Sequence, residues 1–445
     1  MNPAHGSAGG SRGPSLLRTA VAAAAVIAAL ILFLWFFLRI DTKDTTLALD
    51  WISIRAGLEH WDLTYVPENG LRYPPWSAAL LLPLGQIPTN AGWGIVAFLT
   101  LAVLSLCLPR GAVSGKAWMA GILLLALSYP AVRTMVDGNV EFLILAGIVL
   151  LEIGLVRKNP FLLGVGVLLA ATKVQETWIL ILCLPLWMGS GWTRRKILLA
   201  LGTAAAVGIP AMLWKGRDWL QSVLTSPYRG SVMDSSLLTT VQRAGLSVAA
   251  ALIVWVLLFG LTALLAARSE RGFSLEGLGF LLAASLLLAP YAAGNNVLIL
   301  YAAAVVPLAI ARRREGVLLA VLINLPYLLV PFREIQFRYS AVYWTVVLGL
   351  AWILFAVRGL PLRRPLPHPA DNRPWNSIIR PTSAPTASRT AATRPSAASL
   401  STAVRFFQAV PNGSNFNARY PRPSASLARS AKSCGVRAPP YQPLA

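Results

Sequence analysis

Side chains that could do chemistry stand in polar segments between long apolar runs. The longest such segment before the C-terminal tail, residues 39–73, contains Asp50 and Asp62. Two shorter polar breaks contain Asp137 and Lys173. A carboxylate can take the proton from an attacking hydroxyl, and a cationic side chain can bind phosphate. These residues therefore suit a reaction that needs one carboxylate base beside a phosphate.

The sequence lacks other common catalytic signatures. It has no HExxH pair, nucleophile elbow or glycine-rich phosphate loop, and its three histidines are scattered. Its three cysteines lie far apart, which predicts neither a disulfide framework nor a metal site. Glycoside hydrolysis usually needs two carboxylates at a set separation. Sugar transfer from a polyprenyl phosphate needs only one, because the phosphate leaves without a general acid. The residues fit the transfer better.

The composition places these segments at a membrane. The residues AVILMFWYC make up 56% of the chain, charged residues make up 13%, and the mean hydropathy is +0.62. A soluble domain is about 45–50% apolar, counting glycine, and about 25% charged. We therefore expect an all-helical polytopic membrane protein, and a soluble enzyme is excluded. The apolar runs predict about twelve spans, at residues 16–38, 91–108, 116–133, 139–156, 160–172, 176–190, 194–214, 244–267, 273–291, 296–311, 315–331 and 340–357.

The loop charges predict the orientation. If the short apolar segment 75–86 does not cross, basic residues fall in alternate loops on the N-terminal side, as the positive-inside rule requires. Both termini are then inside the cell, and the polar loops, 39–74 among them, face outward from the cell (inner) membrane. Within the spans charges are few. Glu152 lies one turn from Arg157 at the inner end, where a structural role suffices.

The net charge of +22 has two sources. Residues 361–445 hold twelve basic residues against one acid and are rich in Pro, Ser, Ala and Thr, which predicts a disordered tail. This tail would be attracted to anionic membrane lipids, or is a solvated extension without a specific role. Much of the remaining excess lies in the inner loops, so it reflects topology, and no nucleic-acid partner is expected. The predicted parts are a disordered N-terminus (1–15), a transmembrane domain (16–360) and the tail.

The first outer segment resembles glycosyltransferase family 87. It contains, in the family's order, Asp50-Trp51, Arg55-Ala56-Gly57, Trp61-Asp62, Arg72-Tyr73-Pro74-Pro75, Leu82-Pro83-Leu84 and Ile87-Pro88. Weaker similarity continues at Asp137-Gly138-Asn139 and at Lys173, so the resemblance covers residues 45–360 in outline. The chain departs from the family at residues 52–54, where a tyrosine pair is usual, and at residues 174–176, where a proline is usual.

The resemblance implies a GT-C-like helical bundle that transfers a hexose, mannose above all. The donor would be a polyprenyl-phosphate sugar and the acceptor a lipid or glycan hydroxyl, with inversion at the sugar. No cofactor is implied, although some GT-C relatives use a divalent metal, and that possibility stays open. The competing class is a transporter or flippase of a lipid-linked sugar, for which a second polar gate on the inner side is expected. A non-catalytic scaffold would leave the polar outer loops without a role.

Carried over by residue, the resemblance makes Asp50 the base, with Asp62 as its rival. Asp50 could instead cap a helix or be a solvated carboxylate. Lys173 and Arg72 would bind the donor phosphate, although Lys173 could simply pair with Glu176.

The remaining candidates each have a structural alternative. Tyr73, which the following proline restricts to an extended conformation, could face the donor or belong to the interfacial aromatic belt. Asp137 and Asn139 could bind sugar hydroxyls or cap the next helix. An apolar channel near residues 75–88 would hold the lipid tail. Polar clusters in 215–243, 291–296 and 332–339 could add contacts, and each is more simply surface.

Overall fold

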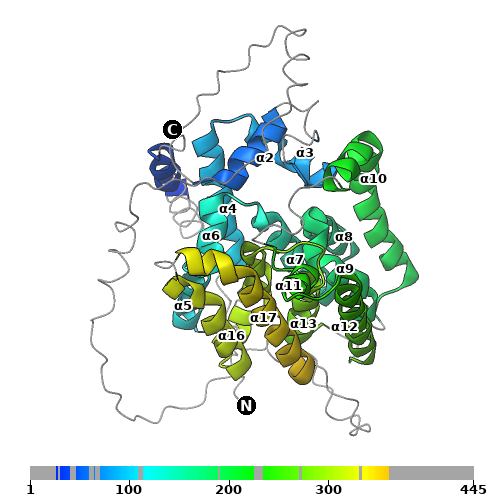
Figure 1. Ribbon diagram of the computed structural model, residues 1–445. Helices are drawn as coiled ribbons and strands as arrows, with labels where there is room; N and C mark the ends of the chain where they lie inside the picture. The colour runs from blue at the N-terminus through cyan, green and yellow to red at the C-terminus, as the bar shows by residue number, and fades with distance from the viewer. Residues whose placement is uncertain are drawn as a thin grey trace, which may run out of the picture. The chain divides into compact units, whose positions relative to one another are not determined.

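The computed structural model describes ten stretches of the chain, at residues 27–28, 31–40, 47–59, 65, 71–108, 114–188, 191–224, 234–269, 273–329 and 333–359. In these stretches the regular structure is helical, and no strand occurs (Figure 1). Side chains of residues 333–338 are not described. The predicted N-terminus (1–15), the tail (361–445) and Asp62 lie outside the described residues.

Most of the described helices follow one another after short connections. Those that bear on the site are α2 (Leu49–Glu59), α3 (Pro75–Gly85), α4 (Thr89–Leu106), α5 (Gly115–Ala126), α6 (Tyr129–Asp137), α7 (Glu141–Val156), α8 (Pro160–Ala170), the 3-10 turn η3 (Ala171–Lys173), α9 (Val174–Trp187) and α10 (Arg194–Leu224). The others are α11 (Leu237–Arg243), α12 (Val248–Arg268), α13 (Leu275–Leu287), η4 (Gly294–Asn296), α14 (Val297–Leu300), the π-helical turn η5 (Tyr301–Val305), α15 (Val306–Ile310), α16 (Arg314–Asn324), η6 (Leu325–Leu329) and α17 (Arg333–Gly359).

Length and composition mark five stretches of the described chain as able to cross a membrane, or six if α5 and α6 count as one bent span. The protein is therefore a membrane protein, while the count of about twelve spans stays a prediction. Three shorter apolar helices, at Pro75–Gly85, Leu275–Leu287 and Gly294–Ile310, fall below the required length.

Two segments differ from their sequence-based outlines. The run predicted as a span at 116–133 consists of two helices, α5 and α6, which meet at an angle of 53°; Ser128 caps the second helix and Pro130 stands in its first turn. The outer loop predicted at 215–243 is largely helical, because α10 continues to Leu224 and α11 occupies Leu237–Arg243. The charges after Trp214 indicated a loop, but Trp219 and Ser222 anchor this end of α10 on Arg72 and Leu71.

The stretch Pro160–Trp187 is long enough for one crossing, yet it folds back on itself. A straight helix of this length would be about 42 Å long. Lys158 before α8 nevertheless touches Gly191 after α9, since a Cβ atom at Gly191 would lie 2.1 Å from the lysine Nζ. The reversal occurs at η3, so α8 and α9 are two short helices with Lys173 at their turn.

Helices α7 and α8 pack with close backbone contact. A Cβ atom at Gly147 would lie 2.2 Å from the Ala170 nitrogen, and one at Gly154 would lie 2.7 Å from the Leu163 nitrogen. Only glycine permits this approach. The pairing is antiparallel, so the start of α7 lies beside the end of α8. This brings residues 139–141 level with η3.

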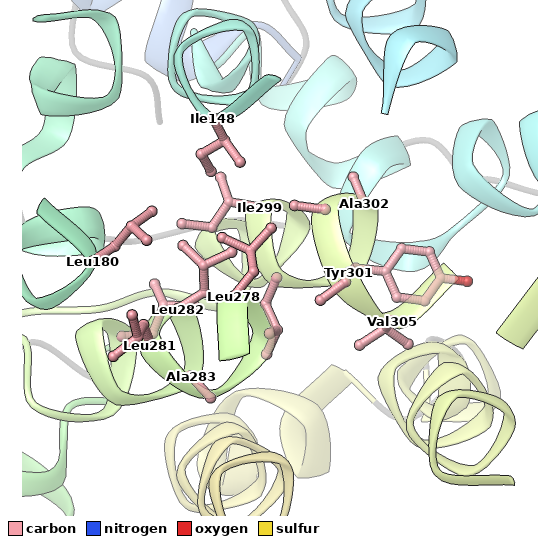
Figure 2. Close-up of a cluster of buried hydrophobic side chains, with 14 of the residues drawn as sticks. Ile148, Leu180, Leu278, Leu281, Leu282, Ala283, Ile299, Tyr301, Ala302 and Val305 are labelled. Carbon is pink, nitrogen blue, oxygen red and sulfur yellow. The ribbon is translucent and has the colours of Figure 1, made fainter. Parts of the chain in front are cut away.

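The core lies around α13, which buries every residue from Leu278 to Leu287. Figure 2 shows part of it, formed by Ile148, Leu180, Leu278, Leu281, Leu282, Ala283, Ile299, Tyr301, Ala302 and Val305 from α7, α9, α13, α14 and η5. By contrast, α10 and α12 expose most of their large apolar side chains. A helix buried all round belongs inside a bundle, and an exposed apolar face suits lipid.

A second apolar cluster positions α2. Trp51 is fully buried and its indole donates a hydrogen bond to the Thr89 carbonyl at 2.9 Å. The Ala48 amide donates to the Val136 carbonyl at 2.7 Å, which ties the start of α2 to α6. Gly138 ends α6 in the left-handed conformation, with φ of 72°. The first turn of α2 therefore lies against the α6–α7 connection.

Replacing Gly138 by alanine is expected to destabilise the fold by about 2–5 kcal/mol. The left-handed conformation costs alanine about 1–2 kcal/mol, and overpacking adds about 1–3 kcal/mol, since the new Cβ would lie 2.5 Å from the Trp51 Cβ. Thermal unfolding of the purified protein measures the change. Gly245→Ala is the matched control, because its φ is 90° and nothing lies within 4 Å of the new Cβ. Equal losses for both variants would show that the contact with Trp51 contributes nothing.

Candidate active site

Asn139 connects two of the predicted site residues. Its amide nitrogen donates to Asp50 Oδ2 at 2.9 Å, and its amide oxygen accepts from the Tyr73 hydroxyl at 3.4 Å. Asp50 comes from the first turn of α2, Tyr73 precedes α3, and Asn139 links α6 to α7. The Asn139 backbone amide donates to the Thr134 carbonyl, so its own position is held by α6. Three segments far apart in sequence thus orient one carboxylate.

Burial dominates the electrostatics of this group. It raises the pKa of the Asp50 carboxyl above its ordinary value, while the charge of Lys173 and the Asn139 hydrogen bond act in the opposite direction. Burial also raises the pKa of the Tyr73 phenol. Tyr73 therefore stays protonated as a hydrogen-bond donor, and Asp50 holds a proton more readily than an exposed aspartate does.

Lys173 lies in a buried cluster next to this group. Its ammonium pairs with Glu141 and, at 3.2 Å, with Glu176. Asn296 donates to both glutamates, at 3.1 Å in the case of Glu141. All four residues are buried. The second carboxylate oxygen, Oε2, of each glutamate has no hydrogen-bond partner among the described residues. The cluster joins the start of α7, the α8–α9 turn and η4.

This cluster shows one residue that the sequence analysis missed. The structure contains the Lys173–Glu176 pair that was the alternative to phosphate binding. Glu141 was overlooked, because it stands in an apolar run and the analysis of charged residues within spans considered only Glu152. The signal was present, since buried charges in such runs are rare and need a partner.

Arg72 and Asp137 lie at the edges of the site. The Arg72 guanidinium donates to Ser222 Oγ at 2.9 Å and to the Leu71 carbonyl, toward α10. Asp137 pairs with Arg133 at 3.0 Å. The capping alternative is wrong for Asp137 and Asn139, because the N-cap of α7 is Val140 and makes no side-chain cap. Asp50 lies inside α2, beyond its cap position.

Helix α3 is fastened to the α8–η3 segment on the other side. The Ser77 hydroxyl donates to Thr172 Oγ1 at 3.0 Å, and the Trp76 indole donates to the Leu168 carbonyl at 3.0 Å. The Tyr65 hydroxyl donates to the Tyr73 carbonyl at 2.9 Å. Tyr73 is therefore held at its backbone carbonyl by Tyr65 and at its hydroxyl by Asn139. The interpretation that segment 75–86 does not cross the membrane stays a prediction.

The site residues of the described chain contain no group of three or more His, Cys, Asp and Glu side chains placed to hold a metal ion. The acidic and basic groups instead pair with one another, as Lys173 does with Glu141 and Arg133 does with Asp137. What the arrangement offers is an oriented carboxylate, a protonated phenol and cationic side chains within one end of the bundle. These are the components of base-assisted transfer from a charged leaving group.

Two comparisons with known proteins bear on which family the chain belongs to. A search of curated proteins found no match. The model of glycosyltransferase family 87 matches residues 71–293, half of the chain. The match includes Tyr73, Asn139 and Lys173, whereas Asp50 precedes it. The chain therefore belongs to glycosyltransferase family 87.

Proposed function

We propose that this membrane glycosyltransferase moves a hexose, in the first instance mannose, from a polyprenyl phosphate to a hydroxyl of a lipid or glycan. Asp50 is the base. The observation that carries the proposal is the hydrogen bond from Asn139 to Asp50 Oδ2, which orients the carboxylate at the meeting point of three segments.

The reaction is a single displacement. Asp50 takes the proton from the acceptor hydroxyl as its oxygen forms a bond to the anomeric carbon of the sugar. The bond between that carbon and the phosphate oxygen breaks, and the polyprenyl phosphate leaves with the electron pair. Attack from the side opposite the phosphate inverts the configuration. Asn139 and Tyr73 hold the base in place, and Asp137 is a candidate contact for sugar hydroxyls.

The charge distribution along α7, α8 and α9 supports an outward-facing site. At one end of these helices lie Asn139 and Lys173 with their partners. At the other end Lys158 contacts Gly191, and Arg157 stands beside it. Since cytoplasmic loops carry the excess of Lys and Arg, the basic end belongs inside and the site outside. We therefore propose that transfer occurs at the outer face of the cell membrane.

The position of Lys173 indicates a supporting role. Its side chain is 9% exposed and contacts two glutamates. We therefore assign it to holding η3 against α7, and the donor phosphate to arginine side chains. Arg72, beside Tyr73 at the start of α3, lies near the apolar segment 75–88 proposed to hold the lipid tail.

The test is transfer of radiolabelled mannose from polyprenyl-phosphate mannose by the full chain in lipid nanodiscs, with membrane lipids and glycans as acceptors. Labelled product should form from this donor and not from a nucleotide sugar. Movement of the intact donor across a bilayer without product would show a transporter. Transfer from a different polyprenyl-phosphate sugar would keep the mechanism and change the sugar.

A further inference from the structure

The candidate site has three cationic side chains, and they differ in how far they are exposed. Lys173 is 9% exposed and pairs with two glutamates. The Arg72 guanidinium donates to Ser222 and to a backbone carbonyl. Arg133 has 45% of its side chain exposed, and the described contact of its guanidinium is the ion pair with Asp137. Of the three, Arg133 offers the most exposed positive charge.

Arg133 is also held close to the base. It lies on α6 one turn before Asp137, and the C-terminal end of this helix packs against the first turn of α2. The Ala48 amide bonds the Val136 carbonyl at 2.7 Å, and Gly138 touches Trp51, the neighbour of Asp50. The charge of Arg133 is near enough to favour the ionised form of Asp50.

The ion pair between Arg133 and Asp137 contributes little to the stability of α6. An ion pair at i,i+4 on a helix contributes only about 0.2–0.5 kcal/mol, and the order with the acid before the base is the better one. Here the arginine precedes the acid. A guanidinium carries five N–H donors in a planar fork, so pairing through one nitrogen leaves donors for a second oxyanion. Asp137 thus fixes the orientation of the Arg133 guanidinium and leaves N–H donors that can bind a second oxyanion.

We propose that Arg133 binds the phosphate of the donor, and that Asp137 positions it. This assignment rests on the proposed function. As the sugar leaves, the bridging oxygen keeps the electron pair, so the phosphate gains one negative charge. A guanidinium placed at that group stabilises the leaving group more than the bound donor, and it therefore lowers the barrier as well as binding.

The test measures binding of polyprenyl monophosphate, which lacks the sugar, to the full chain in nanodiscs of neutral lipid. Arg133→Gln should weaken this binding by about 10-fold or more, since charge-assisted hydrogen bonds to phosphate are lost. Arg133→Lys should recover part of it, because it keeps the charge and loses the fork. Arg217→Gln is the matched control, because Arg217 is an exposed arginine of α10 and should leave binding unchanged.

Two further readouts separate the possible failures. Polyprenol without phosphate should bind all variants equally, which separates the contribution of the phosphate from that of the lipid tail.

If Arg133 only stabilised α6, Arg133→Gln and Asp137→Asn would lower the melting temperature together and leave phosphate binding intact, and the assignment would be overturned. If wild type transfers mannose and Arg133→Gln binds as well as wild type, only Arg133 is wrong. If wild type does not bind polyprenyl phosphate, the proposed donor and this assignment fail together.

Discussion

Asp50→Asn is expected to lower kcat by about 10²–10⁴-fold, the contribution of a positioned general base. The substitution keeps the size of the side chain and a hydrogen-bonding amide, and it removes the group that takes the acceptor proton. Because Asn139 can turn its amide to suit a new partner, the link between α2 and α6–α7 should persist. Thermal unfolding should therefore change little while turnover is lost.

The pH dependence of kcat provides the second readout for Asp50. The base must be deprotonated, and burial raises its pKa. Activity should therefore fall as the pH drops through this raised pKa, at a higher pH than an exposed aspartate would give. Residual activity of Asp50→Asn should lack this acid limb.

The matched control for Asp50 is Asp218→Asn. Asp218 is 53% exposed on α10, where it pairs with Lys215, and its removal should leave kcat unchanged. If Asp50→Asn retained wild-type turnover, the base would be another outer carboxylate, with Asp62 the first to replace.

The sequence was sufficient to select the three residues that form the hydrogen-bonded group around the Asp50 carboxylate. Asp50, Tyr73 and Asn139 each stand in a polar break, and the alternation of basic loops assigned those breaks to one end of the bundle. The structure places the three side chains in one hydrogen-bonded group. Which atoms meet could not be predicted, because this depends on the left-handed turn at Gly138 and on the burial of Trp51.

The sequence was not sufficient to predict that Glu141 and Lys173 meet. Glu141 and Lys173 are 32 residues apart, and a pattern of hydropathy does not show at what depth each lies. Their meeting follows from the close packing of α7 on α8, which Gly147 and Gly154 permit. Likewise, the charged end of α10 was interpreted as a loop, because its contacts with Arg72 and Leu71 are tertiary.

Lys173→Met is expected to destabilise the protein by about 3–5 kcal/mol, the usual cost of leaving buried charge unpaired. The change removes the ammonium that contacts both Glu141 and Glu176, and Asn296 alone cannot neutralise two carboxylates. Thermal and chemical unfolding in detergent measure the loss. Lys158→Met is the control, because Lys158 is exposed at the opposite end of α8 and its removal should cost little.

The triple variant Lys173→Met, Glu141→Gln, Glu176→Gln decides what the lysine does. With no buried charge left, much of the lost stability should return, since replacing a whole buried ion cluster is often close to neutral. If Lys173 instead bound the donor phosphate, the triple variant would fold and still show a raised KM for the donor. A stable Lys173→Met protein with that raised KM would restore Lys173 as the phosphate partner. Recovery of both stability and KM in the triple variant would show that the cluster serves only to hold η3 against α7.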